Sequence, residues 1–329
     1  MIMSRTPFRM SFAGGGSDLR TFYSKHPGQV LSTTINKYMY IAVHPFFGRK
    51  NIQVKYSKTE LVEDVSQIQH PIVREALKKF GLSGIDINSI ADIPAGTGLA
   101  SSSAFTVGLL HVLYAYQGKF VSQERLAQEA CELEIDILKD PIGKQDQYAS
   151  AYGGLNVLTF YPDEHVKIEP LILPRSTMQR FNDRLLLFYT GDSRAARAIL
   201  AQVTIESLQE ETFRALKKMT DLVRQLRDAL LDDRLDECGR LLHEGWLIKR
   251  SLTSGISTPK IDAYYERALQ SGALGGKLLG AGGGGFLLVY CPPERQDDVR
   301  RALAELPEQP FRFDFFGSKI IYVGDKDWE

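Results

Sequence analysis

The sequence predicts an α+β fold, and three observations support this class. The chain has 329 residues, enough for one large domain or two domains of ordinary size with well-formed cores. Strand-like and helix-like stretches follow one another in mixed order, which argues against the strict alternation of a doubly wound sheet. A loop rich in glycine and serine at residues 94–104 joins a strand-like run to a long apolar run near the centre of these stretches.

The composition excludes several functional classes. Forty basic residues balance forty acidic ones, so no net charge attracts nucleic acid or an anionic membrane. Three widely spaced cysteines give neither a disulfide framework nor zinc-ligand spacing. The first ten residues do not resemble a signal peptide, and no apolar run approaches the roughly 18 residues of a membrane span. We expect a cytoplasmic protein without nucleic-acid or membrane partners, and the oligomeric state stays open.

The N-terminal segment predicts a strand followed by a tight turn. Residues 8–12 alternate apolar and polar side chains, the period of a half-buried strand. The strand leads into Gly14–Asp18, where three glycines permit backbone conformations closed to other residues. In isolation the segment Gly14–Asp18 fits a plain glycine-rich turn with a solvated aspartate equally well. We therefore treat Asp18 as a candidate binding residue only in combination with other motifs.

The next stretch combines strands with one helix. Residues 30–43 and 52–56 have the composition of strands. Residues 71–80 show helical spacing of apolar side chains, and Gly81 is the stop signal. These elements precede the central loop, which places strands ahead of most helices in this half of the chain.

The central loop, Pro94–Ala104, reads PAGTGLASSSA and lies between a predicted strand (85–93) and an apolar run (104–116). Its glycines allow a tight turn and a close approach to a ligand. A helix that begins at the serines would direct free N–H groups and its positive dipole end into the loop. The loop is thus a candidate phosphate cradle, although it lacks the Gly-Lys-Ser/Thr of a Walker A motif. The alternative is a simple strand-to-helix connection in which a serine caps the helix.

A helix is predicted over residues 122–138, with Ser122 as its cap. Glu134 lies on the apolar stripe of this helix, which consists of Ala127, Ala130, Cys131, Ile137 and Leu138. A carboxylate in such a stripe needs a partner, because burial of an unpaired charge is costly. The partner is either a basic side chain in a structural salt bridge or a metal ion. Mg²⁺ is a suitable ion, because it takes one or two protein carboxylates together with phosphate oxygens.

The second half contains a strand at 185–189, a long helical region that ends near residue 231, and a helix at about 234–251. We expect the charged faces of these helices to be exposed to solvent, and Trp246 to belong to the core. Arg194 follows a Thr-Gly turn at the predicted start of a helix, where it is a candidate anion contact.

Residues 275–290 read GGKLLGAGGGGFLLVY and contain a G-x-G-x-x-G motif. A dinucleotide-binding fingerprint requires a helix after this motif, whereas here a β-type segment (286–290) follows. The sequence also lacks the His-Arg-Asp and Asp-Phe-Gly triplets of protein kinases. A Rossmann domain and a protein kinase are therefore both excluded.

Together these motifs resemble those of the GHMP kinases, a family of small-molecule kinases. The match rests on Pro7-Phe8-Arg9 with the turn Gly14–Asp18, the loop Pro94–Ala104, the element Gly143–Gln147 (GKQDQ) and the late glycine motif. The resemblance implies ATP as phosphoryl donor, Mg²⁺ as cofactor and two domains. These would be a mixed α/β domain at residues 1–180 and a ferredoxin-like domain at residues 181–329, with the active site between them.

The resemblance also assigns roles to individual residues. Asp146 would be the catalytic base and Arg9 its neighbour, while Ser102 and Glu134 would bind Mg²⁺. For Glu134 this agrees with the argument from periodicity. The remaining ATP-loop positions would be Pro94, Gly96, Gly98, Leu99, Ala100, Ser101 and Ser103, of which the two serines are also substitutes for Ser102 at the metal. The third glycine motif, which would pack near the active site, consists of Gly280, Gly282, Gly283 and Gly284.

The substrate expected from the resemblance is a sugar. Its contacts would be Gly15, Gly16, Ser17, Asp18 and Arg194. Gly15 and Gly16 stand where galactokinase has a bulky Glu-His pair, which favours a larger sugar than galactose. The sequence Arg-Thr-Pro-x-Arg at residues 5–9, with GGGSD and GKQDQ, is similar to the heptose 7-phosphate kinase branch of the family.

This branch implies phosphorylation of the anomeric hydroxyl of D-glycero-D-manno-heptose 7-phosphate to the 1,7-bisphosphate, in the biosynthesis of nucleotide-activated heptose for surface polysaccharide. The phosphate that such a sugar already carries needs cations. Those closest in sequence to the motifs are Arg20, Lys144, Arg194 and Lys277, and none is assigned individually. The alternatives are another sugar 1-kinase such as an L-fucose kinase, and a sugar sensor of the same fold without turnover.

Overall fold

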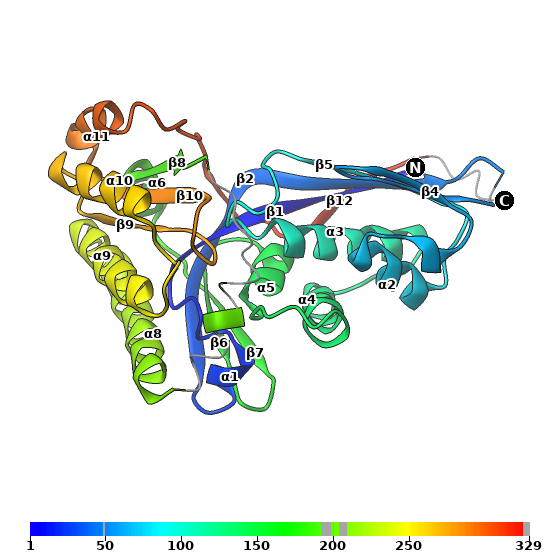
Figure 1. The fold of residues 1–329 in the computed structure, drawn as a ribbon, viewed down its shortest axis with the longest axis horizontal. Coiled ribbons are helices and arrows are strands. Elements are labelled where there is room, and N and C mark those ends of the chain that lie inside the picture. Colours follow the sequence, from blue (N-terminus) through cyan, green and yellow to red (C-terminus); the bar gives the residue numbers. More distant parts are fainter. Residues whose placement is uncertain (49, 192–198, 200, 204–208, 325–329) are drawn as a thin grey trace.

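A computed structural model describes residues 1–48, 50–191, 199, 201–203 and 209–324. Two sheets organise this part of the chain (Figure 1). The larger sheet has the strand order β12-β1-β2-β5-β3-β4, with β6, β7 and β11 attached along β2 and β6. Its strands are β1 (Ile2–Ala13), β2 (Gly28–Pro45), β3 (Ile52–Lys55), β4 (Thr59–Val62), β5 (Ile85–Ala91), β6 (Asn156–Phe160), β7 (Val166–Pro170), β11 (Phe313–Asp314) and β12 (Lys319–Val323).

Helices α2, α3, α4 and α5 gather on one face of the larger sheet, with α3 packed along β1 and β2, whereas α6 lies beside the smaller sheet (Figure 1). The predicted helix at 71–80 is confirmed as α2, and Gly81 ends it in the left-handed conformation at φ 63°. The helices of this half are α1 (Arg20–Tyr23), α2 (Pro71–Phe80), α3 (Ser101–Tyr116), α4 (Gln123–Cys131), α5 (Gln145–Tyr152) and α6 (Arg175–Asp183), with a 3₁₀ turn η1 (Val65–Gln67).

Strand β1 differs from the half-buried strand that its alternation predicts. Arg9 and Ser11, the polar positions of the alternation, are buried along with the apolar ones. The reason is that β1 contacts α3 and α5 of the first half and also α8 (Glu210–Leu231) and α9 (Leu235–Ser251) of the second. The alternating polar side chains therefore face the junction of the two halves rather than bulk solvent.

The helix predicted at 122–138 forms, but it is not continuous. The Ser122 side chain caps α4 by accepting a hydrogen bond from the Arg125 N–H at 3.2 Å, and a π-helical segment, η2 (Glu132–Ile137), follows. Because a π turn adds a residue per turn, it changes which positions face the core. Glu134 is fully buried as expected, whereas Ile137 is 46 % exposed, so the predicted stripe is wrong at its C-terminal end.

The second half has its own sheet, and most of a second core cluster, which also includes Leu19 and Phe22, comes from this half. Its sheet has the antiparallel order β8-β10-β9, and Leu187 and Tyr189 of β8 also exchange backbone hydrogen bonds with residues 307–309. This fourth short segment completes the strand order of a ferredoxin-like fold, which confirms the predicted two-domain α+β class. The elements are β8 (Leu185–Tyr189), β9 (Gly275–Leu278), β10 (Phe286–Tyr290), α8, α9, α10 (Pro259–Gln270), η3 (Pro293–Arg295) and α11 (Gln296–Ala302).

The chain does not end in the second sheet. Strand β11 pairs with β2 and strand β12 pairs with β1, so residues 313–323 belong to the larger sheet (Figure 1). The predicted boundary between residues 180 and 181 falls inside α6 and stays a prediction, and the last strands return to the first sheet. Trp246 is fully buried in the core of the second half. Across the described residues no helix combines the length and apolar character needed to cross a membrane.

Candidate active site

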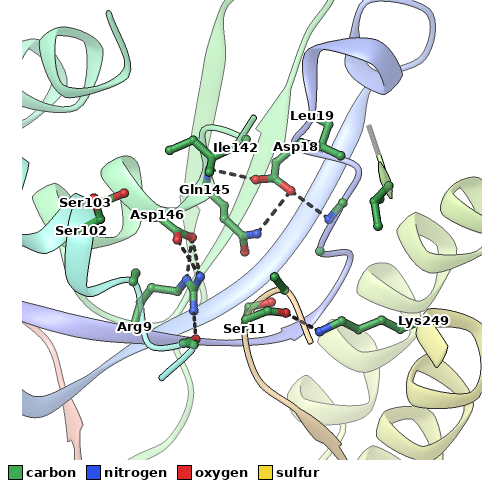
Figure 2. Close-up of a pocket in the computed structure, with 18 of the residues that line it drawn as sticks. Arg9, Ser11, Asp18, Leu19, Ser102, Ser103, Ile142, Gln145, Asp146 and Lys249 are labelled. Atoms are coloured by element: carbon green, nitrogen blue, oxygen red, sulfur yellow. Dashed lines mark hydrogen bonds and ion pairs between the residues drawn. The ribbon is translucent and has the colours of Figure 1, made fainter. Parts of the chain in front are cut away.

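A cavity of about 280 Å³ lies where the two halves meet. One wall comes from the first half: the end of β1, the turn that follows it, the loop before α3 and the start of α5. The other wall comes from the second half: the last turn of α9, the end of β9 and the glycine loop after it. Figure 2 shows the labelled side chains that converge on this space.

The central loop places the start of α3 at the cavity. The residue that caps α3 is Ala100, which has φ 66° and makes no side-chain capping bond, so the alternative of a serine cap is wrong. Instead, Ser101, Ser102 and Ser103 form the first turn of α3 and line the cavity. The first N–H groups of a helix lack partners within the helix, and its dipole is positive at this end. An anion in the cavity would meet both.

The loop before α3 packs directly on the glycine loop of the second half. A Cβ atom on Gly280 would lie 2.4 Å from the Cα of Gly98, and one on Gly98 would lie 2.5 Å from the Leu279 carbonyl oxygen. The Phe286 N–H donates to the Thr97 carbonyl oxygen at 3.2 Å. Side chains at these glycines would therefore push the two loops apart, and their absence brings the two walls of the cavity into contact.

Arg9 and Asp146 form a two-pronged ion pair at the floor of the cavity (Figure 2). Arg9 Nε donates to Asp146 Oδ1 and Nη2 donates to Oδ2, both at 2.7 Å. The remaining guanidinium nitrogen, Nη1, donates to the Gly98 carbonyl oxygen at 2.9 Å. Such a bidentate pair fixes the orientation of the carboxylate. Asp146 also lies in the first turn of α5, where the helix dipole favours a negative charge. The two residues predicted to act together are thus held together, and tied to the phosphate loop.

Glu134 is fully buried and is held by neutral donors. Ser102 Oγ donates to Oε1 at 2.8 Å, Ser103 Oγ donates to Oε2 at 2.9 Å and Gln147 Nε2 donates to Oε2 at 2.6 Å. Burial raises the pKa of the Glu134 carboxyl to about 7, although these three hydrogen bonds act in the opposite direction. Among the described residues no basic side chain pairs with Glu134, so the salt-bridge alternative finds no support there.

The donor set at Glu134 fits Mg²⁺. A carboxylate and a serine hydroxyl lie within hydrogen-bond distance of each other beside the start of α3, and hard cations prefer such oxygen ligands. In the described part of the chain no group of three or more His, Cys, Asp or Glu side chains is placed to hold a metal. A metal at Ser102 and Glu134 would therefore take its other ligands from phosphate oxygens and water.

Asp18 lies across the cavity from Ser102 and Ser103 (Figure 2). Its Oδ1 accepts hydrogen bonds from the Gly16 N–H at 2.9 Å and from Gln145 Nε2 at 3.3 Å. Burial, and next the nearby charge of Asp146, raise the pKa of the Asp18 carboxyl. A Cβ on Gly143 would lie 2.0 Å from Asp18 Oδ2, which explains the glycine that opens the GKQDQ element. The solvated-aspartate alternative for Asp18 is wrong.

Other predicted site residues fall into two groups. Gly15, Gly16, Gly96, Gly98 and Gly280 line the cavity. Ser17 is buried away from it, and its hydroxyl donates to the carbonyl oxygens of Gly14 and Gln29, so it is a turn residue and not a substrate contact. Arg194 lies outside the described residues. Glu134 is predicted for the site but does not itself line the cavity, because it is buried behind Ser102 and Ser103. The other predicted positions that do not line the cavity are Pro94, Leu99, Gly282, Gly283 and Gly284.

Two of the cations predicted to neutralise a substrate phosphate are already paired. Arg20 is bound to Asp136 at 2.9 Å and to Glu164 at 3.1 Å. Lys144 is bound to the Glu164 carboxylate and donates to its carbonyl oxygen. Neither side chain lines the cavity, although both are near the motifs in sequence.

The cavity residues that the sequence did not identify include Ser11, Gln145 and Lys249, and Lys277 was named only as one cation among several. Lys249 is buried, which corrects the expectation that the charged positions of this helix face solvent. A signal was available, because Lys249 follows Trp246 by three residues and Leu242 by seven, on the buried face of α9.

The comparisons with known proteins agree with this architecture. Residues 65–154 match the GHMP kinases N terminal domain and residues 226–309 match the GHMP kinases C terminal domain. The chain is 27 % identical over 341 residues to D-glycero-alpha-D-manno-heptose 7-phosphate kinase of Campylobacter jejuni, covering 99 % of this chain and 98 % of that protein. It is also 27 % identical to the bifunctional fucokinase/GDP-fucose pyrophosphorylase of Arabidopsis thaliana, with 92 % of this chain but 31 % of that protein covered.

A solved structure supports the fold over its full length. The D-glycero-D-manno-heptose 1-phosphate kinase from Bacteroides thetaiotaomicron superposes with a TM-score of 0.81 at 24 % identity, covering 99 % of this chain and 100 % of that one. Both halves of the chain thus match one family in sequence, and the whole chain matches it in fold. The chain belongs to the GHMP kinase family, whose members are ATP-dependent phosphotransferases.

Proposed function

We propose that this protein transfers the γ-phosphoryl group of ATP to the anomeric hydroxyl of D-glycero-D-manno-heptose 7-phosphate and produces the 1,7-bisphosphate. Two findings support the substrate: the likeness to the Campylobacter jejuni heptose 7-phosphate kinase over nearly the full length of both chains, and the open turn at Gly15 and Gly16, which lines the cavity. In the cell the product would serve the synthesis of nucleotide-activated heptose for surface polysaccharide.

The phosphates of ATP would lie at the start of α3. The free N–H groups of the first turn and the serine hydroxyls provide donors for phosphate oxygens. Ser102 and Glu134 would hold Mg²⁺, which when bound offsets the negative charge of the transferred group. Burial of Glu134 behind Ser102 and Ser103 keeps the carboxylate oriented toward this position.

The acceptor hydroxyl would lie beside Asp146. The hydroxyl oxygen forms the new bond to phosphorus, ADP leaves, and the hydroxyl proton passes to a carboxylate oxygen of Asp146. Arg9 holds this carboxylate in one orientation through two hydrogen bonds of 2.7 Å. The observation that carries the proposal is that this ion pair and the first turn of α3 line the same cavity.

Sugar hydroxyls would be bound by the residues opposite Ser102 and Ser103. Asp18 is a buried acceptor in the cavity. Gln145 Oε1 is buried and makes no hydrogen bond to any described residue, which leaves it ready to accept one from a hydroxyl. Asp18 and Gln145 are joined through Gln145 Nε2, so they form one polar surface for a polyhydroxylated ligand.

A second candidate function is an L-fucose 1-kinase. It is favoured by the likeness to part of the bifunctional Arabidopsis thaliana protein and to part of the L-fucokinase/L-fucose-1-P guanylyltransferase of Bacteroides fragilis, of which 31 % and 26 % are covered. The motifs at Arg9, Glu134 and Asp146 serve a sugar 1-kinase of either specificity, so only the acceptor distinguishes the two.

The test is a substrate screen in which ADP formation is coupled to a spectroscopic signal. The acceptors are heptose 7-phosphate, the unphosphorylated heptose, L-fucose and galactose, each with ATP and Mg²⁺. We expect heptose 7-phosphate to have the highest kcat/KM. A higher value for L-fucose would establish the second candidate, and binding of a sugar without ADP formation would instead indicate a sensor that has lost turnover.

A further inference from the structure

Two lysines on the second-half wall of the cavity are buried without a countercharge. Lys249 is 9 % exposed and Lys277 is 5 % exposed, and both line the cavity. Within the described part of the chain neither pairs with a carboxylate. Lys249 Nζ donates to the carbonyl oxygens of Leu278 and Gly280 at 3.0 and 2.5 Å, and Lys277 Nζ donates to that of Phe12 at 3.2 Å.

This arrangement is costly for the free protein. A charged ammonium group loses its hydration on burial, and neutral carbonyl dipoles replace only part of it. Burial, followed by the charge of Arg9, lowers the pKa of Lys249 to about 7, and burial lowers that of Lys277 well below its usual range. A bound anion would supply the missing charge and return both lysines to their protonated form.

The position of the lysines indicates which anion this is. Figure 2 shows Ser102 and Ser103 on one side of the Arg9–Asp146 pair and Lys249 on the other. ATP phosphates at the serines would therefore be separated from the lysines by the site of phosphoryl transfer. An anionic group at the lysines would belong to the acceptor, at an end remote from the hydroxyl that reacts.

The neighbouring side chains fit this interpretation. Ser11 lines the cavity near Lys249, and its hydroxyl has no hydrogen-bond partner among the described residues (Figure 2). A hydroxyl and two ammonium groups are suitable donors for the oxygens of a phosphate dianion. Arg20 and Lys144, by contrast, are neutralised by carboxylates and lie outside the cavity lining.

We propose that Lys249, Lys277 and Ser11 form the subsite that binds the phosphate group already present on the acceptor. This inference rests on the proposed function, because it takes the acceptor to be a phosphorylated sugar. It goes beyond that function by assigning recognition of the phosphate to two lysines of the second half with Ser11 of β1 beside them, while the sugar hydroxyls and the reacting group lie against the first half.

The kinetic test compares Lys249→Met and Lys277→Met with the wild type. Arg250→Met is the matched control, because it removes a cation from the same turn of α9, one that is paired with Asp262 at 3.1 Å and does not line the cavity. The quantity measured is the ratio of kcat/KM for heptose 7-phosphate to kcat/KM for the unphosphorylated heptose. We expect each lysine variant to lower this ratio about 10- to 100-fold, with an unchanged KM for ATP, and the control to preserve it.

A second measurement is independent of turnover. Inorganic phosphate is added to the protein while a non-hydrolysable ATP analogue occupies the loop before α3, and Tm is compared with that in chloride of equal ionic strength. We expect phosphate to raise the Tm of the wild type and of Arg250→Met, and most of this rise to be lost when both lysines are replaced by methionine.

The outcomes separate this inference from the proposed function. Turnover of heptose 7-phosphate with an unchanged ratio in the lysine variants, or a loss confined to the KM for ATP, would overturn the subsite and keep the function. A phosphate-induced rise in Tm that survives the double substitution would also overturn it. If the wild type turns over no heptose phosphate but the rise in Tm requires both lysines, the substrate is wrong and the subsite stands for another phosphorylated acceptor.

Discussion

The two walls of the cavity differ in whether their charged side chains have partners of opposite charge or other strong hydrogen-bond partners. On the first-half wall each charged group of the proposed machinery has a partner: Arg9 binds Asp146, and Glu134 receives three hydrogen bonds. On the second-half wall Lys249 and Lys277 meet only carbonyl oxygens among the described residues. Paired groups are held in place before the ligands arrive, which is what transition-state stabilisation requires. Unpaired buried cations instead favour the state in which an anion is bound.

The largest effect on turnover is expected from a substitution of Asp146, on the first-half wall where the charged groups are paired. Asp146→Asn keeps an acceptor for Arg9 but removes the carboxylate that takes the hydroxyl proton. We expect turnover to fall about 10²- to 10⁴-fold, since a positioned base contributes that much. Steady-state ADP release is the measurement, with circular dichroism and ATP binding as controls for folding. Near-wild-type turnover in a folded Asp146→Asn protein would remove Asp146 from the mechanism.

Glu134→Gln tests the proposed role of Glu134 as a Mg²⁺ ligand at the first-half wall. The substitution keeps the shape of the side chain and one acceptor oxygen for a serine hydroxyl, but it removes the charge that a cation needs. We expect the half-saturating Mg²⁺ concentration for activity to rise on the order of 10-fold or more, with a smaller change in the KM for the sugar. Glu132→Gln is the matched control, because Glu132 lies in the same π-helical segment but is exposed and paired with Lys79. An unchanged Mg²⁺ titration with a lowered Tm would mean that Glu134 is structural.

The difference between the walls also explains what the sequence could predict. Glu134 was found because its helical phase and a family motif identified the same residue. Lys249 lies on the buried face of α9 just as regularly, three residues after Trp246 and seven after Leu242. A lysine near the end of a charged helix nevertheless resembles a surface residue until this spacing is considered. Arg20 and Lys144 attracted attention through proximity in sequence, whereas the fold pairs them with Asp136 and Glu164.

Elements of secondary structure were easier to predict than their surroundings. The helix at 71–80 and its glycine stop depend on local spacing alone, and the structure has both. The burial of Arg9 and Ser11 depends on contacts of β1 with α3 and α5 and with α8 and α9, and the last two helices are about two hundred residues away along the chain. The π turn after α4 likewise has no signature in the apolar pattern, so Ile137 was assigned to the wrong face.

A smaller effect is expected where the two walls touch. Gly280→Ala would place a Cβ 2.4 Å from the Cα of Gly98, whereas Gly118→Ala meets nothing within 4 Å. The two glycines have nearly equal φ, 73° and 70°, so backbone strain is matched and the difference between the variants reports the contact. We expect Gly280→Ala to lose about 1–3 kcal/mol more of the free energy of unfolding than Gly118→Ala, measured by urea titration. Equal losses would show that the two loops separate at no cost.

The smallest effect is expected on the stability of the ligand-free protein when Lys249, on the second-half wall, is replaced. The pKa of Lys249 is about 7 in the folded protein and ordinarily 10.5. Between these values the unfolded chain binds a proton that the folded protein does not, so the contribution of Lys249 to stability rises with pH through this window and is lowest below pH 7. Lys249→Met should therefore be more stable than the wild type by on the order of 1 kcal/mol at pH 7, and the gain should shrink toward pH 10. Thermal unfolding across this pH range is the measurement, and a destabilised variant at pH 7 would contradict the cost assigned to this lysine.

The proposed function depends most on the product that the enzyme forms from a phosphorylated sugar. Phosphorus NMR of the product formed from heptose 7-phosphate, ATP and Mg²⁺ tests this directly. The two-sided cavity predicts a product that retains the original phosphate signal and gains a second one coupled to the anomeric proton, with Asp146→Asn forming far less of it. A new phosphate at any other position, or no phosphorylated product from a folded enzyme that binds ATP, would contradict the account.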